Sequence, residues 1–463
     1  MKRFFTIFAA ACALAITTLP GGEVGKPSVK SKSSLTFSEH IAPIVFNNCT
    51  SCHRPGEAGP FALMSYADVK KRGALIAAVT QTRYMPPWHA TPGYGDFIDV
   101  HRLTDEQIGE IKQWVDAGMP EGDPSKLPAL PKFTEGWQLG KPDMILTMTE
   151  PFEVPASGPD IYRNFTIPMN IPENKWIKAV EFRPSARKVV HHSLFFLDTT
   201  GESRKHDGEG GQPGYNGGLD GTRFAKSGRL GGWAVGANPH ILPAGLALPL
   251  YKGSDFVLQI HFHLSGKAEK EQSSIGLYFA DKAPERMIAG VQVPAVFGVG
   301  AGIDIPAGEK AYTISDSFTL PIDVDGFAIG GHAHYIAKDM QATATLPDGS
   351  KQWLLWIKDW DFSWQDQYQY KKPIALPKGT RIDVAITYDN SADNPRNPSH
   401  PPKRVKWGEQ SFDEMGSVTL QVAPVNQAEF PTLMTALQQK RTEAIQNAYK
   451  QRRAGLFQFL KPE

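Results

Sequence analysis

The sequence predicts a multidomain fold, in which a small all-α domain precedes two all-β sandwich domains and a C-terminal helix. Three observations support this class. Apolar residues recur at helical spacing on both sides of residues 49–53. Between residues 143 and 425, short segments of alternating polarity are separated by turn residues. Residues 428–455 form a basic segment with a modest apolar stripe, which is typical of a packed or solvated helix.

The N-terminus, residues 1–20, reads as a secretory signal peptide. Lys2 and Arg3 form its positive start, and residues 4–19 form an apolar stretch that is too short to be a bilayer span. Cys12 lies inside this stretch, and the alternative of a lipoprotein anchored there would leave a very short apolar segment. We therefore expect a protein exported to a bacterial periplasm or secreted, with no membrane span.

The net charge and the number of cysteines limit the possible binding partners and disulfide bonds. Removal of Lys2 and Arg3 with the signal would change the formal net charge from +1 to −1, so nothing indicates nucleic acid as a partner. Cys49 and Cys52 would then be the only cysteines in the mature chain. We therefore expect the β domains to be held together by their cores alone.

Two helices are expected in the N-terminal domain. Residues 37–46 place apolar residues at helical spacing, and residues 103–118 form a second helix with an apolar stripe. Thr104 and Gln107 have the spacing of a capping box at its start, and Gly118 stands at its expected end.

Between these helices lies the pentapeptide Cys-Thr-Ser-Cys-His. Cys49, Cys52 and His53 form the C-x-x-C-H pattern of covalent c-type haem attachment, in which two thiols bond the haem vinyl groups and the imidazole ligates iron. A thioredoxin-like dithiol would need a βαβ frame, and half of a zinc site would need further ligands nearby. Neither is visible in the sequence, so haem c is the expected cofactor.

With its flanking helices, this region resembles a class I cytochrome c, and we assign it to residues 35–123. Such a domain needs a second axial iron ligand, which in cytochromes c is usually a Met thioether. Met85, followed by two prolines, is the preferred candidate. Met64 is the alternative, although it could equally be a core residue.

The amino-acid composition changes after residue 123. Residues 124–142 are rich in Pro and Gly and read as a linker. Residues 143–280 and 281–425 are then expected to form the two β-sandwiches, and residues 426–463 a helical tail. The Gly-rich run 207–236 reads as a long surface loop. Six segments carry the strand pattern: 145–149, 176–182, 189–197, 256–264, 341–346 and 417–422.

The histidines in this β region are grouped. Six of the thirteen lie in three strand-like segments, as His191 with His192, His261 with His263, and His332 with His334. Residues two apart on a strand share a face, whereas the adjacent pair would need a twist or bulge to reach one ion. Imidazoles combined with a thioether suit copper.

The order of these motifs resembles a known family. Residues 190–196 (VHHSLFF), 258–262 (LQIHF), 331–335 (GHAHY) and 413–416 (DEMG) follow the succession found in the copper type II, ascorbate-dependent monooxygenases. This group includes peptidylglycine α-hydroxylating monooxygenase and dopamine β-monooxygenase. The resemblance covers roughly residues 143 to 425.

The resemblance implies two mononuclear coppers in two nucleoplasmin-like sandwiches of the jelly-roll kind. By motif match, the electron-transfer copper would be held by His191, His192 and His261. The copper that binds dioxygen and substrate would be held by His332, His334 and Met415. His263 matches no ligand of the family, and is either a partner of a ligand or a polar surface residue. The animal enzymes also have disulfides, which this chain cannot form.

The sequence therefore predicts a copper-dependent monooxygenase that hydroxylates a C–H bond of a small organic substrate with dioxygen. A periplasmic electron donor would feed it through the fused c-type haem. The alternatives are a non-catalytic haem and copper redox or copper-binding protein, and an oxidase that reduces dioxygen without a substrate.

Overall fold

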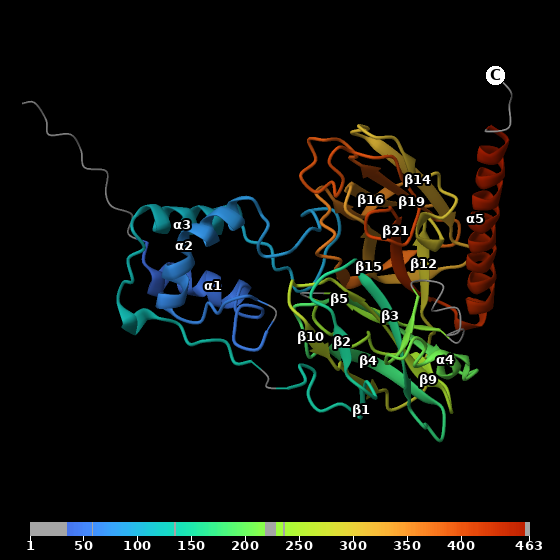
Figure 1. Cartoon of the computed structure of the whole chain (residues 1–463), viewed down its shortest axis with the longest axis horizontal. Helices are drawn as coiled ribbons and strands as arrows, with labels where there is room; N and C mark the ends of the chain where they lie inside the picture. The colour runs from blue at the N-terminus through green and yellow to red at the C-terminus, as the bar shows by residue number, and fades with distance from the viewer. Residues whose placement is uncertain (1–34, 58, 134–135, 218–227, 235–236, 459–463) are drawn as a thin grey trace, which may run out of the picture.

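The fold consists of a helical lobe beside a larger β lobe, with a long helix along the outer side of the β lobe (Figure 1). It is seen in a computed structural model that describes residues 35–57, 59–133, 136–217, 228–234 and 237–458. The predicted signal peptide and Cys12 lie outside the described residues. None of the helices in these ranges combines the length and the apolarity needed to cross a bilayer.

The helical lobe packs around Phe37 and Trp114, whose buried rings lie 6.1 Å apart. Both expected helices are present. The capping box also forms, because Gln107 N–H donates to Thr104 Oγ1 at 3.1 Å and Thr104 N–H donates to Gln107 Oε1 at 3.0 Å. One further helix, α2, was not expected. The helical elements are η1 (Phe37–Ile41), α1 (Ala42–Asn48), α2 (Tyr66–Gln81), α3 (Asp105–Asp116) and η2 (Pro124–Lys126).

The first β-sandwich consists of two antiparallel sheets of order β1-β11-β4-β8 and β6-β3-β9-β5-β7. Its core lies between them and includes Phe165, Phe256 and Ile275. Its elements are β1 (Met144–Thr147), β2 (Phe152–Val154), β3 (Ile161–Pro168), β4 (Lys175–Arg183), β5 (Val190–Asp198), α4 (Glu202–His206), β6 (Tyr215–Asn216), β7 (Arg229–Ala234), β8 (Leu248–Leu250), β9 (Asp255–Phe262), β10 (Glu269–Glu271) and β11 (Ser274–Phe279).

The described part of the Gly-rich run 207–236 contains two strands, while residues 218–227 and 235–236 of the expected loop lie outside the described residues. β6 pairs with β3, and β7 forms the edge of the same sheet beside β5. The expectation of a loop was wrong for these two strands, because glycines give a strand no side-chain alternation from which it could be recognised.

The second β-sandwich has sheets of order β12-β21-β15-β18 and β14-β19-β16-β17. The turn at 347–349 joins β16 to β17, with Gly349 at φ +84°. Its elements are β12 (Ala289–Val293), η4 (Val296–Gly298), β13 (Asp304–Ile305), β14 (Tyr312–Thr319), β15 (Val324–Ala333), β16 (Ala337–Thr345), β17 (Lys351–Ile357), β18 (Gln367–Leu376), β19 (Arg381–Tyr388), β20 (Val405–Lys406) and β21 (Gly416–Pro424).

The expected tail helix is present as α5 (Phe430–Gln458), preceded by η5 (Gln427–Glu429). Leu433 buries its side chain in the core of the second sandwich. Further along, α5 packs closely on Gly300, where an added Cβ would lie 2.3 Å from the Ala444 carbonyl oxygen. The tail helix therefore packs on the second sandwich at Leu433 and again near Gly300.

A segment of the N-terminal region completes the core of the second sandwich. Between α2 and α3 the chain crosses to the β lobe, where Trp88, Ala90 and Phe97 are buried in that core. Isolated bridges join Ala90 to Ile357 and Phe97 to Tyr370. We call residues 88–98 the strap. The strap lies within the range 35–123 predicted for the N-terminal domain, yet it belongs to a different core.

We expect Trp88→Ala to destabilise the second sandwich by about 3–5 kcal/mol, because it removes a large buried side chain from that core. Hydrogen exchange followed by mass spectrometry should show faster exchange in β17 and β18, with the helical lobe less affected. Tyr84→Ala is the control, since Tyr84 lies four residues earlier and is 47% exposed. Equal exchange in both variants would show that the strap adds nothing to the core.

Candidate metal sites

The first candidate site lies where β5 and β9 run side by side. His192 and His261 are register partners, and the register shifts between Val190 and His192, so His191 is the extra residue of a β-bulge. A bulge lets two consecutive side chains turn toward the same place. The adjacent histidines His191 and His192 are therefore brought together by a β-bulge, one of the two arrangements that their spacing demanded. His191, His192 and His261 are referred to below as the triad.

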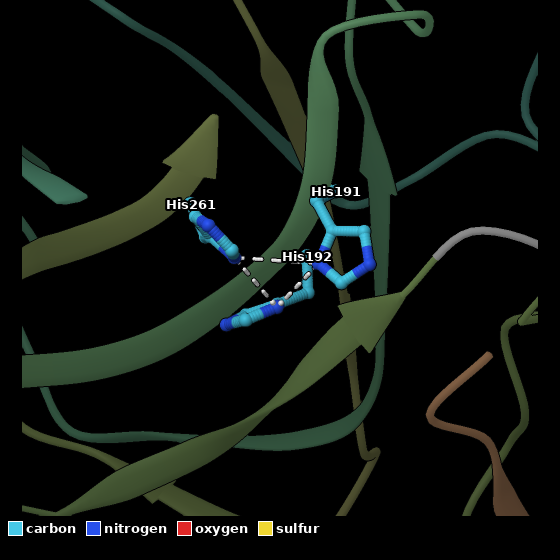
Figure 2. A group of neighbouring side chains, drawn as sticks. All are labelled: His191, His192 and His261. Atoms are coloured by element: carbon cyan, nitrogen blue, oxygen red, sulfur yellow. Dashed lines mark hydrogen bonds between the residues drawn. The ribbon is translucent and has the colours of Figure 1, made fainter. Parts of the chain in front are cut away.

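The three imidazoles of the triad converge through one kind of atom (Figure 2). The Nδ1 atoms of His191 and His192 are 3.1 Å apart, those of His191 and His261 are 3.3 Å apart, and those of His192 and His261 are 3.4 Å apart. The centre of this triangle lies about 1.9 Å from each nitrogen, close to the length of a metal–imidazole bond. The triad can therefore hold one metal ion.

The electrostatics of the triad favour neutral rings. Burial, followed by the nearby His261, lowers the pKa of His191 to about 3. The pKa of His192 is lowered well below its usual value, again by burial and then by its neighbours His261 and His191. Imidazole must be unprotonated to ligate a metal, so these rings do not have to lose a proton near neutral pH.

Asp160 fixes the orientation of His261. Its Oδ2 lies 2.9 Å from His261 Nε2 and accepts a hydrogen bond from Ser411 Oγ at 2.8 Å, while its Oδ1 lies 3.1 Å from His263 Nδ1. Burial alone would raise the pKa of Asp160, but the hydrogen bonds from His261 and Ser411 lower it overall. With Nε2–H donating to the carboxylate, His261 turns its Nδ1 lone pair toward the triad centre. His263, which is 59% exposed, contacts Asp160 and not the triad.

The second candidate site lies on the neighbouring strands β15 and β21. The register pairs His332 with Ser417 and Ala333 with Gly416, so one further step places Met415 beside His334. The rings of His332 and His334 are 5.4 Å apart at 87°. Both Nδ1 atoms face oxygen acceptors, because His332 Nδ1 is 2.6 Å from Gln365 Oε1 and His334 Nδ1 is 3.2 Å from the Asp413 carbonyl. This tautomer places the ligating lone pair on Nε2.

Glu414 holds the backbone of the second site together. Its carboxyl accepts hydrogen bonds from the N–H groups of His334 at 2.9 Å, Ile336 at 2.8 Å and Met415 at 3.1 Å. Burial raises the pKa of Glu414 to about 8, although these bonds act in the opposite direction. The motif Asp-Glu-Met-Gly thus supplies both the thioether and the group that ties it to the His334 strand.

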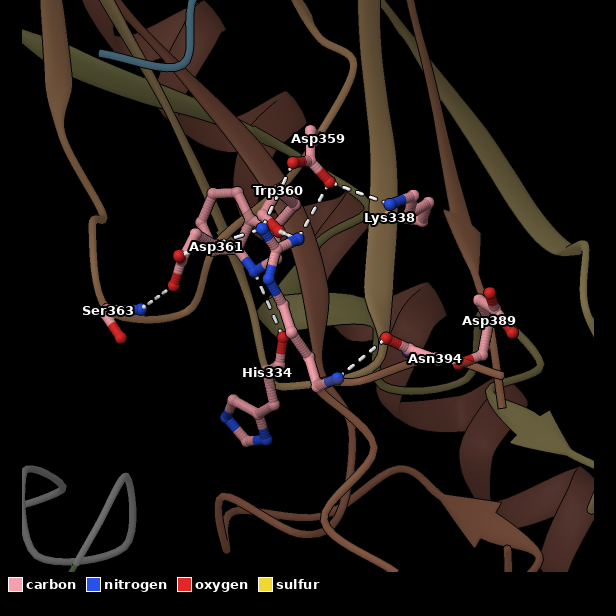
Figure 3. A network of polar contacts seen from close by, with 9 residues as sticks. His334, Lys338, Asp359, Trp360, Asp361, Ser363, Asp389 and Asn394 are labelled. Carbon is pink, nitrogen blue, oxygen red and sulfur yellow. Dashed lines mark hydrogen bonds and ion pairs between the residues drawn. The ribbon is translucent and has the colours of Figure 1, made fainter. Parts of the chain in front are cut away.

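The loop between β17 and β18 contacts both candidate sites, and no sequence motif indicated it. The Phe362 ring stacks on His191 at 4.8 Å and meets the edge of His334 at 5.6 Å. In the same loop, Gln365 bonds His332. Trp360 Nε1–H donates to the His334 carbonyl at 3.1 Å (Figure 3). A single aromatic side chain therefore lies between ligand rings of the two sites.

Both sites face one continuous cleft of about 1590 Å³. Its lining includes His192, His332, His334 and Met415, and it extends to Cys52. Pro86 and Pro87, directly after Met85, also line it. The cleft therefore brings all three motifs of the sequence to one connected space.

The C-x-x-C-H motif fixes the orientation of its histidine. His53 Nδ1 lies 3.0 Å from the Phe61 carbonyl, which orients the ring and places the ligating lone pair on Nε2. Burial, and secondarily the charge of Cys52, raises the pKa of Cys49 to about 12, and burial also raises that of Cys52. A reactive dithiol would need a lowered thiol pKa, so the site does not resemble one. Met64 and Met85 are both half-buried.

The haem-motif loop is joined to the first sandwich. Glu57 pairs with Arg187 at 2.8 Å and with Arg54 at 3.1 Å. Arg187 lies four residues before His191. The helical lobe therefore contacts the first sandwich near the start of the strand that carries two triad ligands, besides being linked to it by residues 124–142.

No known family model matches the chain, and no curated protein does. Solved structures that align with it include the major capsid protein P2 of bacteriophage PM2, with 10% identity and a TM-score of 0.22 over 57% of this chain and 97% of that one. The VP2 subviral particle of infectious bursal disease virus aligns at 11% identity and a TM-score of 0.17, over 65% and 76% of the two chains. These superpositions are loose, so the sandwich assignment rests on the strand pairing described above.

We expect Asp160→Asn to weaken copper binding at the triad by about 10- to 100-fold, because one amide oxygen cannot replace a carboxylate that has three hydrogen-bonding partners. Competition with a chelator of known affinity measures this. Asp304→Asn is a matched control, since Asp304 pairs with Arg404 on the second sandwich. Equal affinities for the two variants would contradict a role for Asp160 in orienting His261.

Proposed function

We propose that this protein is an exported copper-dependent monooxygenase that hydroxylates a C–H bond of a small organic substrate with dioxygen. Electrons would arrive from a periplasmic donor through a covalently bound c-type haem. The observation that carries the proposal is the pairing of two different donor sets on one cleft. One set has three converging Nδ1 atoms, and the other has two imidazoles and a thioether.

The donor sets fit copper. Nitrogen ligands suit Cu(II), and a thioether favours Cu(I), so a site with both can hold copper in either oxidation state. When bound, copper would supply dioxygen activation and single-electron transfer, and haem would supply the electrons. The residues of the chain hold the rings in place: Asp160 orients His261, and Gln365 and the Asp413 carbonyl orient His332 and His334.

The burial of the second site supports an enzyme. Met415 and His334 are buried, yet both line the cleft together with Phe297, Trp407 and Gln292. Apolar and neutral amide side chains thus lie beside the donor set, which suits a small organic molecule. The proposal places the substrate in this part of the cleft.

The test is oxygen incorporation. Copper-loaded, reduced protein supplied with ¹⁸O₂ and a panel of small organic compounds should yield a product heavier by one ¹⁸O atom. His332→Ala should abolish this product, because it removes a ligand of the Met415 set, while the haem absorbance should remain. Oxygen uptake without a labelled product would instead indicate an oxidase, and neither activity would indicate a redox or copper-binding protein.

The haem part of the proposal has its own prediction. We expect a low-spin haem with His53 and Met85 as axial ligands, because imidazole and thioether together give a strong ligand field. Met85→Ala should remove the near-infrared charge-transfer band of Met-ligated ferric haem, while Met64→Ala should leave it. The reverse result would assign the ligand to Met64, and loss of covalent haem is expected only on replacing Cys49 or Cys52.

A further inference from the structure

The triad belongs to the first sandwich, but two side chains of the second sandwich complete its surroundings. All three ligands lie on β5 and β9. Phe362 and Ser411 come from loops of the second sandwich: Phe362 packs on His191 and His261, and Ser411 reaches His261 through Asp160. Each therefore links the geometry of the triad to the way in which the two sandwiches are packed together.

Phe362 confines His191. Its ring is 4% exposed and stacks on the His191 imidazole with an interplanar angle of 29°. It also packs on Tyr335 at 4.6 Å and on His261 at 6.1 Å. Because His191 is the extra residue of a bulge, its ring is not aligned by the regular pleat of the sheet. The face of Phe362 supplies the alignment.

Ser411 acts on His261 through Asp160. The buried hydroxyl donates to Asp160 Oδ2, the same oxygen that faces His261 Nε2. The carboxylate is thus held between a donor from the second sandwich and a ligand from the first. Removal of the hydroxyl would leave Asp160 free to turn toward His263.

Hydrogen bonds hold the loop that carries Phe362 to the rest of the second sandwich. Arg396 donates to Asp359 Oδ1 at 2.8 Å and to the Trp360 carbonyl at 2.7 Å. Lys338 binds the same Asp359 carboxylate at 2.8 Å (Figure 3). Trp360 is itself buried and bonded to the His334 backbone. The loop that carries Phe362 is therefore bonded to the second sandwich through Asp359 and Trp360.

We propose that Phe362 and Ser411 are positioning residues through which the second sandwich sets the geometry of the triad, so that metal binding at the triad and docking of the two sandwiches are coupled. The proposal rests on metal binding by the triad, which is part of the proposed function. Such coupling is reciprocal: an ion held by aligned ligands stabilises the docked arrangement, and docking tightens the site.

The experiment measures copper affinity of the full chain in a His332→Ala background, so that the triad is the site under measurement. Phe362→Ala and Ser411→Ala should each weaken binding about 10-fold, because each removes a group that fixes a ligand of the triad. Phe362→Tyr and Ser411→Thr should restore it. Phe412→Ala is the matched control, because Phe412 adjoins Ser411 and is 60% exposed.

Two further readouts separate positioning from general damage. The Cu(II) electron paramagnetic resonance spectrum of the triad should change in Phe362→Ala and Ser411→Ala but not in Phe412→Ala. Added copper should also slow hydrogen exchange in residues 359–366 of the parent and not of Phe362→Ala. If Phe362→Ala does not fold, the same measurements are made on Phe362→Leu, which keeps an apolar side chain but lacks the ring.

The outcomes distinguish the two proposals. Unchanged affinity and spectra in Phe362→Ala and Ser411→Ala, with copper lost in His191→Ala, would overturn the positioning role and leave the metal site intact. Failure of the parent triad to bind copper would overturn both this inference and the proposed function.

Discussion

Three imidazole nitrogens held within 3.4 Å of one another impose the constraint on which the site depends. Protons on all three would repel strongly in a buried place, and three lone pairs without a cation would also repel one another. The surrounding structure resolves this by keeping the rings neutral and by directing His261 Nδ1 inward through Asp160. A shared cation would make the arrangement favourable, and the bulge at His191 brings the three rings together.

The two donor sets present opposite sides of the imidazole ring. In the triad the inner atoms are Nδ1, whereas in the second set Nδ1 faces Gln365 and the Asp413 carbonyl. A strand that carries alternate histidines projects both from the same face, and the acceptors at the two Nδ1 atoms leave the Nε2 atoms as the ligating ones. Consecutive histidines at a bulge instead meet close to the backbone, through Nδ1. Strand register, together with the hydrogen-bond partners of each ring, thus produces two chemically different sites from one residue type.

Local patterns were predictable from the sequence, and tertiary ones were not. Capping and strand alternation depend on neighbouring residues, so the flanking helices and the six strand segments could be placed. Helix α2 escaped notice because its buried face includes small residues such as Gly73 and Ala77, and β7 because it contains Gly231 and Gly232. The histidine pairs stood out by spacing. Phe362 and Asp160 could not be recognised from the sequence, since they lie in loops and contact the histidines only after distant strands have paired.

The strap has a consequence for the order in which the chain can fold. Ala90 and its bridge partner Ile357 are about 270 residues apart, so this contact cannot form until most of the chain has been made. The helical lobe depends on local contacts and can form early, which leaves Trp88 and Phe97 exposed until β17 and β18 appear. The N-terminal region is therefore not a detachable module. Cutting the chain between the helical lobe and the sandwiches would remove Trp88, Ala90 and Phe97 from the core of the second sandwich.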